Sequence, residues 1–203
     1  MSRFVFATAQ YASGDWDSAP SLPGNLIDSV ARYTSIEVAP AGVVVRLDSD
    51  ALFGHPFVWL TGHLPVRFTD AERRNVKRFV ERGGFLMIDD HNHDINGAFH
   101  QTALEEIERS FGRMTRLPAD HDLYRCFFVF KDGPPGTHHE LNGWGDDLVH
   151  PYLDAVLVDG RIGLLYSSKD YSSEWDFHAE SKRFMSEDIT KFGVNLIVYA
   201  LTR

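Results

Sequence analysis

Residues 85–89 constrain the fold more than any other part of this chain, because four successive positions (Phe-Leu-Met-Ile) are apolar. A strand with one face in water alternates polar and apolar residues, whereas a strand in a parallel sheet is buried on both faces and has a continuous apolar run. Gly83 and Gly84 precede the run, and Asp90 and His91 follow it. We therefore expect a central strand of a parallel sheet, with helices on both faces.

Strand and helix patterns alternate along the chain, which is typical of a three-layer α/β domain with a mainly parallel central sheet. Apolar runs predict strands at residues 3–11, 43–47, 56–61, 85–89, 126–130 and 162–166. Apolar residues at helical spacing predict helices from about residue 25, after Thr69, after Thr102 and over residues 186–201. Thr69 with Glu72, and Thr102 with Glu105, match the capping-box pattern that begins a helix.

The length and charge of the chain restrict its class. Its 203 residues, 43% of them hydrophobic, are enough for a single domain over residues 1–203, with a long irregular loop at about 131–151. The formal charge of −9 argues against a nucleic-acid backbone or an anionic membrane as partner. No apolar run approaches the roughly 20 residues that a membrane helix needs.

The cysteine content and the first residues bear on the compartment. Cys126 is the only cysteine, and its apolar neighbours indicate core packing rather than nucleophilic chemistry. The N-terminal residues lack the layout of a signal peptide. We expect a soluble protein in the reducing environment of the cytoplasm.

Polar side chains gather where the predicted strands end. Asp15 and Trp16 follow the first strand, His63 follows the third, and the central strand leads into Asp89-Asp90-His91-Asn92-His93-Asp94. The carboxyl ends of parallel strands share one edge of a sheet, where ligands usually bind. We therefore expect Asp15, Trp16 and Asp89 to contact a ligand and Asp90 to act as a general base.

The histidines of this region suit a divalent metal, because neutral imidazole and carboxylate ligate zinc, iron, manganese and nickel. If their segment is extended, His91 and His93 point the same way, and His121 or His63 would supply a third ligand. The alternative is that Asp89 and Asp90 hold a turn while the histidines face solvent. The later loop adds His138, His139, Glu140 and His150, whose place in the fold the pattern does not give. No glycine-rich loop follows a strand, so we expect no nucleotide cofactor.

Five stretches in a fixed order carry a family resemblance: residues 14–16 (Gly-Asp-Trp), 55–63 (His-Pro-Phe-Val-Trp-Leu-Thr-Gly-His), 81–90 (Glu-Arg-Gly-Gly-Phe-Leu-Met-Ile-Asp-Asp), 160–167 (Gly-Arg-Ile-Gly-Leu-Leu-Tyr-Ser) and 193–202 (Gly-Val-Asn-Leu-Ile-Val-Tyr-Ala-Leu-Thr). Together the stretches resemble the prokaryotic domain of unknown function 4159. The resemblance implies a flavodoxin-like fold of the class I glutamine-amidotransferase-like group. It implies no particular activity.

The chain departs from true amidotransferases at one decisive place. Those enzymes carry a nucleophilic cysteine on the turn after the strand that corresponds to residues 85–89, whereas this chain has Asp90 and His91 there. Because a thiolate is needed to form the glutaminyl thioester, we expect no glutaminase activity.

Two functions remain open from the sequence. The first is a non-glutaminase, amidotransferase-like domain that binds a ligand at the carboxyl edge of its sheet, with a divalent metal as the candidate ligand. The second is a metal-dependent hydrolase that uses His and Asp ligands and a metal-activated water. The small-molecule or protein partner of either remains unspecified.

Overall fold

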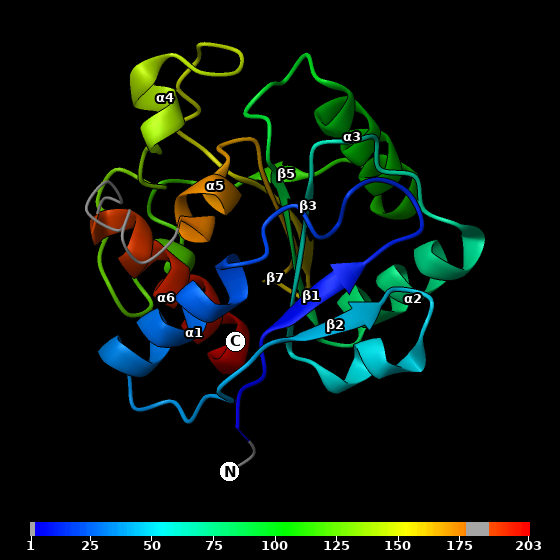
Figure 1. The fold of residues 1–203 in the computed structure, drawn as a ribbon, viewed down its shortest axis with the longest axis horizontal. Helices are drawn as coiled ribbons and strands as arrows, with labels where there is room; N and C mark the ends of the chain where they lie inside the picture. The colour runs from blue at the N-terminus through cyan, green and yellow to red at the C-terminus, as the bar shows by residue number, and fades with distance from the viewer. Residues whose placement is uncertain (1–2, 178–186) are drawn as a thin grey trace.

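The structure is a computed structural model that describes residues 3–177 and 187–203 (Figure 1). Its strands are β1 (Ala7–Gln10), β2 (Val43–Arg46), β3 (Phe57–Gly62), β4 (Phe85–Asp90), β5 (Thr115–Arg116), β6 (Asp154–Val158) and β7 (Arg161–Ser167). Its helices are α1 (Leu22–Tyr33), α2 (Asp70–Glu81), α3 (Ala98–Phe111), α4 (His138–Asn142), α5 (Tyr171–Asp176) and α6 (Glu187–Thr202), with 3-10 turns η1 (Asp50–Gly54) and η2 (Asp122–Tyr124). The predicted start of the last helix, residue 186, lies outside the described residues.

The described strands form one sheet in the order β2-β1-β3-β4-β7-β6-β5. The first five of these run parallel, whereas β6 and β5 are antiparallel to their neighbours. β4 lies at the centre, and all six of its residues are buried. The predictions of an α/β fold, of a mainly parallel sheet and of residues 85–89 at its centre are confirmed. The antiparallel edge was not predicted.

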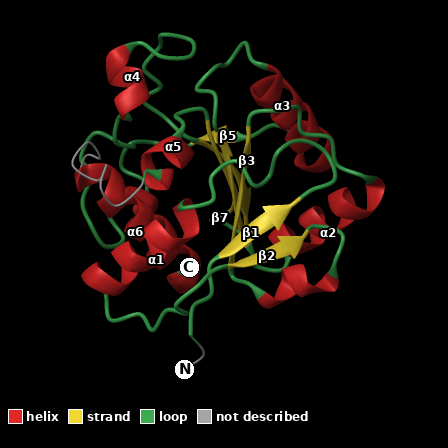
Figure 2. Cartoon of the chain, in the orientation of Figure 1, coloured by secondary structure: helices red, strands yellow, loops and turns green. Residues whose placement is uncertain are grey.

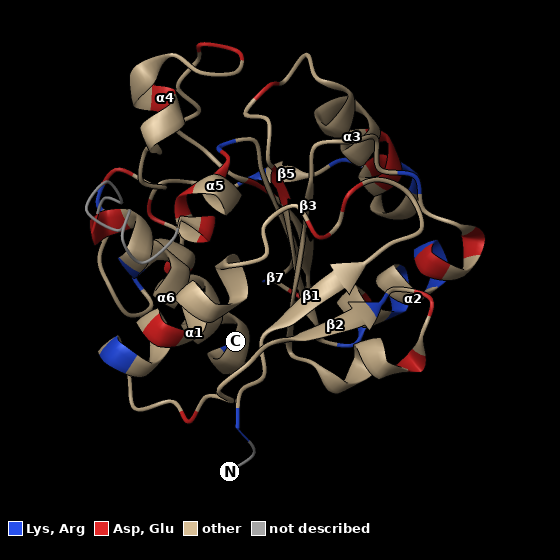
Figure 3. Ribbon diagram, viewed as in Figure 1, with Lys and Arg blue, Asp and Glu red and all other residues tan. Residues whose placement is uncertain are grey.

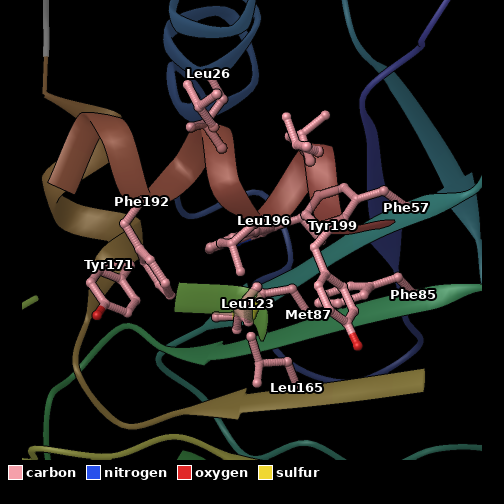
Figure 4. Close-up of a cluster of buried hydrophobic side chains, with 14 of the residues drawn as sticks. Leu26, Phe57, Phe85, Met87, Leu123, Leu165, Tyr171, Phe192, Leu196 and Tyr199 are labelled. Atoms are coloured by element: carbon pink, nitrogen blue, oxygen red, sulfur yellow. The ribbon is translucent and has the colours of Figure 1, made fainter. Parts of the chain in front are cut away.

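Helices cover both faces of the sheet (Figures 1 and 2). The helices α1, α5 and α6 pack on one face, and α2 and α3 pack on the other. Figure 4 shows Leu196 and Tyr199 of α6 lying over Met87 and Phe85 of the central strand, with Phe192 beside Tyr171 of α5. A strand covered on both faces has no side for water, which is the physical reason for its unbroken apolar sequence.

One of the two predicted capping boxes begins a helix. Thr69 Oγ1 accepts the N–H of Glu72 at 3.2 Å, and Glu72 Oε2 accepts the N–H of Thr69 at 2.7 Å, so α2 begins as predicted. The second prediction is wrong, because α3 already begins at Ala98. Thr102 lies inside that helix, where its hydroxyl donates to the carbonyl of Ala98 at 2.7 Å.

The predicted strand at residues 126–130 is wrong, because this segment is an irregular loop. A side chain of α6 takes the place of a neighbouring strand: Asn195 Oδ1 accepts the N–H of Phe128 at 2.8 Å, and its Nδ2 donates to the carbonyls of Leu123 and Phe128, both at 2.9 Å. Buried backbone groups need hydrogen-bond partners, and a side chain can be that partner as well as a strand.

Residues 131–151 are irregular, apart from the short helix α4 within them. Figure 1 shows α4 beyond α5 and outside both helical layers. None of the described helices combines the length and the apolar character that a membrane span requires.

Candidate functional site

The candidate site lies at the carboxyl edge of the parallel strands. There β1 leads to Asp15, β3 to His63, β4 to His91 and His93, and β7 to Asp170. The chain goes from β1 to β2 on one side and returns to β3 on the other, so the order reverses at β1. Ligands of open α/β sheets bind outside the strand ends at such a reversal.

Asp15 and His63 form a dyad beside this reversal. Asp15 Oδ2 lies 2.7 Å from His63 Nδ1, and Oδ1 accepts the backbone N–H groups of His63 at 2.8 Å and Leu64 at 2.9 Å. Burial by itself would raise the pKa of Asp15, but these hydrogen bonds outweigh it and lower the pKa below its usual value. The charged carboxylate thus fixes the orientation of a partly exposed imidazole.

Gly62 is required for this arrangement. A Cβ atom at Gly62 would overlap the hydroxyl of Tyr11 and lie 2.8 Å from Asp15 Oδ1. The strand end therefore approaches Asp15 more closely than any other residue type allows.

His91 lies against His63, with ring centroids 4.2 Å apart and planes 23° from parallel. Its Nδ1 is 3.2 Å from Ser18 Oγ, and its Nε2 is 3.9 Å from Asp170 Oδ1. Burial, followed by the neighbouring His63, lowers the pKa of His91 to about 4. His91 is therefore neutral near pH 7, the state in which an imidazole ligates a metal.

His93 points elsewhere, so the expectation that His91 and His93 face the same way is wrong. The chain turns immediately after β4, and His93 has a φ of +49°, far from an extended conformation. The carboxylate of Asp90 holds this turn, since its oxygens accept the backbone N–H groups of Asn92 at 3.0 Å and Asp94 at 3.3 Å. Asp90 therefore holds the turn after β4.

His93 instead meets the later loop, where it forms a cluster with Asp146 and His150. One candidate ligand atom from each of the three lies within 4.8 Å of the others. His93 Nε2 is 3.5 Å from Asp146 Oδ1, and His150 Nε2 is 2.9 Å from Asp146 Oδ2. Burial would raise the pKa of Asp146, but the hydrogen bonds, first that from the N–H of Ile95, lower it, so the carboxylate is charged.

Both ring nitrogens of His93 face carbonyl oxygens. Its Nδ1 is 2.8 Å from the carbonyl oxygen of Ser168, and its Nε2 is 2.9 Å from that of Leu148. A neutral imidazole has one N–H and one lone pair, so it can donate to only one of these acceptors. When Nδ1–H donates to Ser168, the lone pair on Nε2 faces another lone pair, and a cation between them is needed to remove the repulsion. That cation is either a proton or a metal ion.

Buried carboxylates outnumber buried cations at this edge. Asp89, Asp90 and Asp170 are at most 3% exposed, whereas Lys169 is the only buried lysine or arginine among the described residues. Burial raises the pKa of Asp89 to about 6 and that of Asp90 to about 7. Figure 3 shows that α5, which follows Asp170, is itself acidic. Burial thus favours the neutral form of these carboxyl groups, and a bound cation would restore their charge.

The other residues expected at the site lie in three places. The carboxylate of Asp89 accepts the backbone N–H of Ser172 at 2.7 Å, so it faces the start of α5. Trp16 lines a pocket with Arg46 at the ends of β1 and β2. His121 packs on Tyr199, whose hydroxyl accepts the N–H of Ile162 at the start of β7. Because β7 runs parallel to β4, His121 is near the opposite edge of the sheet and is not brought to His91.

Sequence reasoning missed Asp146 and Asp170. Asp170 follows a predicted strand at residues 162–166, so the rule that ligands gather at strand ends could have found it. Nothing local marks Asp146, because it reaches His93 through the fold of an irregular loop.

The family comparison adds no activity. A family described as "Domain of unknown function (DUF4159)" matches residues 5–201. The chain belongs to this family. No curated protein matches the chain. Because the DUF4159 family has no assigned activity, a function for this chain has to be argued from the geometry of the sheet edge.

Proposed function

We propose that this DUF4159 domain binds a divalent transition-metal ion at the carboxyl edge of its sheet, with His93, Asp146 and His150 as protein ligands. The observation that carries the proposal is His93 Nε2, which faces both the carbonyl of Leu148 and the carboxylate of Asp146. Imidazole and carboxylate suit zinc, iron, manganese or nickel. Metal-bound histidines usually donate their other N–H to a carbonyl or carboxylate, and the carbonyl of Ser168 occupies that position here.

The fold supports an amidotransferase-like domain without glutaminase activity. The five parallel strands follow the order β2-β1-β3-β4-β7, which is the 2-1-3-4-5 order of flavodoxin-like sheets. Cys126 lies far along the chain from the turn after β4. Its thiol packs near the carbonyls of Leu123 and Asn195. Its position supports a packing role rather than a nucleophilic one.

Isothermal titration with Zn²⁺, Mn²⁺, Ni²⁺ and Fe²⁺ tests the metal proposal. The parent protein and His138→Ala, a variant of an exposed histidine in the same loop, should bind metal. His93→Ala and His150→Ala should lose the ion that these residues hold. The competing state is a doubly protonated His93 paired with Asp146. Nitrogen NMR that shows both N–H groups of His93 unchanged at saturating metal would contradict the proposal.

A metal-dependent hydrolase is the second candidate, and the Asp15–His63 dyad is the observation that favours it. A carboxylate at Nδ1 orients an imidazole whose Nε2 can then accept a proton. His63 suits the general base better than Asp90, whose oxygens already accept backbone N–H groups. Metal-dependent hydrolysis of ester and phosphoester model substrates, lost in His63→Gln with metal binding retained, would establish this candidate.

A further inference from the structure

The carboxylate of Asp170 lies between two imidazole nitrogens. Its Oδ1 is 3.9 Å from His91 Nε2, and its Oδ2 is 3.4 Å from His139 Nε2. The three residues come from the turn after β4, the segment after β7 and helix α4. They share no residue with the cluster of His93, Asp146 and His150.

The two contacts are not hydrogen bonds. His139 Nε2 is buried and has no hydrogen-bond partner among the described residues. The separation of His91 Nε2 from Asp170 Oδ1 exceeds the 3.2 Å that an N–H···O hydrogen bond spans. A buried polar atom without a partner is costly, so such an atom in a native structure calls for a ligand, an ion or a water.

Asp170 also lacks a lysine or arginine partner within the described segments, although its Oδ1 accepts the N–H of Ser173 at 3.0 Å. Asp170 is 3% exposed. The nearest candidate in the sequence, Lys169, points to Glu140, whose two carboxylate oxygens lie 2.6 and 2.7 Å from its Nζ. A buried carboxylate is stable only if it is paired, protonated or bound to a metal.

The spacing approaches that of a shared ion. Among the described residues only His93, Asp146 and His150 each present one ligand atom within 4.8 Å of the others, so an ion here would draw His91 and His139 closer to Asp170. Metal bonds to imidazole nitrogen and carboxylate oxygen are about 2.0–2.2 Å long, which places neighbouring ligand atoms of a tetrahedral site roughly 3.4 Å apart. His139 Nε2 lies at this distance from Asp170 Oδ2, whereas His91 Nε2 faces the other oxygen, Oδ1, and must move about half an ångström closer. His91 Nδ1 meets Ser18 Oγ, the outer partner that a metal-bound imidazole usually has.

From these contacts we infer a second metal site, formed by His91, His139 and Asp170, for a divalent first-row transition ion. The site stands independently of the proposed function, because it uses none of the three ligands of that cluster. It joins the ends of β4 and β7 to α4, so an ion there would tie the long loop to the edge of the sheet.

The test is the number of ions bound per chain, measured by titration with Zn²⁺ and by the visible absorption of Co²⁺. The parent protein and the neighbouring-histidine control His138→Gln should bind two ions. His139→Gln and Asp170→Asn should each bind one. Asn suits position 170, because it tolerates the left-handed φ of +56° and can still cap α5 through Ser173 N–H.

The outcomes separate the two sites. Loss of one ion relative to the parent in both His139→Gln and Asp170→Asn supports the inference, even if His93→Gln removes nothing. An unchanged number of ions in both variants refutes it, whatever His93→Gln does. Asp170→Asn also guards against misfolding, because asparagine keeps the size of the side chain and the cap of α5.

Discussion

The ammonium of Lys169 lies 2.6 and 2.7 Å from the two carboxylate oxygens of Glu140, and both side chains are buried. Lys169 follows β7, whereas Glu140 belongs to α4 in the long loop. The same ammonium donates to the carbonyl of His150 at 2.6 Å. This ion pair therefore fixes the loop that brings His139, Asp146 and His150 to the edge of the sheet.

Removing one partner of this pair should be strongly destabilising. Lys169→Met leaves the Glu140 carboxylate buried without a cation, which costs about 3–5 kcal/mol of unfolding free energy. Urea denaturation measures the loss. The double variant Lys169→Met/Glu140→Gln should recover part of it, because no unpaired charge remains and the amide oxygen can still accept one of the buried N–H groups of Thr137 and His150. Equal losses in the single and double variants would show that the pair does not act as a unit.

Gly62→Ala should destabilise the protein and disturb the dyad of Asp15 and His63. The added Cβ overlaps the Tyr11 hydroxyl and crowds Asp15, and overpacking of this kind typically costs about 1–3 kcal/mol. Gly54→Ala is the matched control, because a Cβ at Gly54 meets no atom within 4 Å. In a Tyr11→Phe background the cost of Gly62→Ala should fall. Thermal melts of the parent, the three single variants and the Tyr11→Phe/Gly62→Ala double variant check the expectation, and equal costs of Gly62→Ala in both backgrounds would argue against it.

Cys126 should react slowly in the folded protein. Burial raises the pKa of its thiol from 9.0 to about 11, so it carries about a hundredfold less thiolate at pH 8 than an ordinary cysteine. Iodoacetamide labelling should accelerate in urea and, in the folded protein, keep rising up to about pH 11. Because the folded-state pKa is the higher one, the stability from the protonated thiol is complete below pH 9 and is lost as pH rises through about 11.

Neither the parent protein nor Cys126→Ala should release ammonia from glutamine. Glutaminase turnover that disappeared in this variant would contradict the assignment of Cys126 to packing.

Asn195→Leu should destabilise the protein by at least about 2 kcal/mol. The leucine is apolar, and it leaves buried backbone groups of Leu123 and Phe128 without partners, each at a cost of about 1–3 kcal/mol. Thr202→Ala, at the exposed end of the same helix, should change stability little. Chemical denaturation of both variants measures the difference, and equal stability would mean that water replaces the amide.

The sequence by itself determined the parts of the fold that depend on neighbouring residues. The apolar run of β4 specified a strand buried on both faces, and the Thr69 box specified the start of α2. The turn after β4 could be assigned to the ligand-binding edge, because parallel strands end on one side. Local patterns also misled, since Thr102 matches a capping box inside a helix and residues 126–130 match a strand that Asn195 replaces.

Only the tertiary structure decided which side chains meet. His93 reaches Asp146 and His150 because its backbone has a positive φ and because a loop more than 50 residues later folds over it. His121 lies on Tyr199 and not beside His91, although the sequence pattern suggested both as ligands of one metal. Residue spacing reports on the periodicity of one element, whereas ligand sets depend on the directions of side chains from several elements. Those directions are fixed only when the whole domain packs.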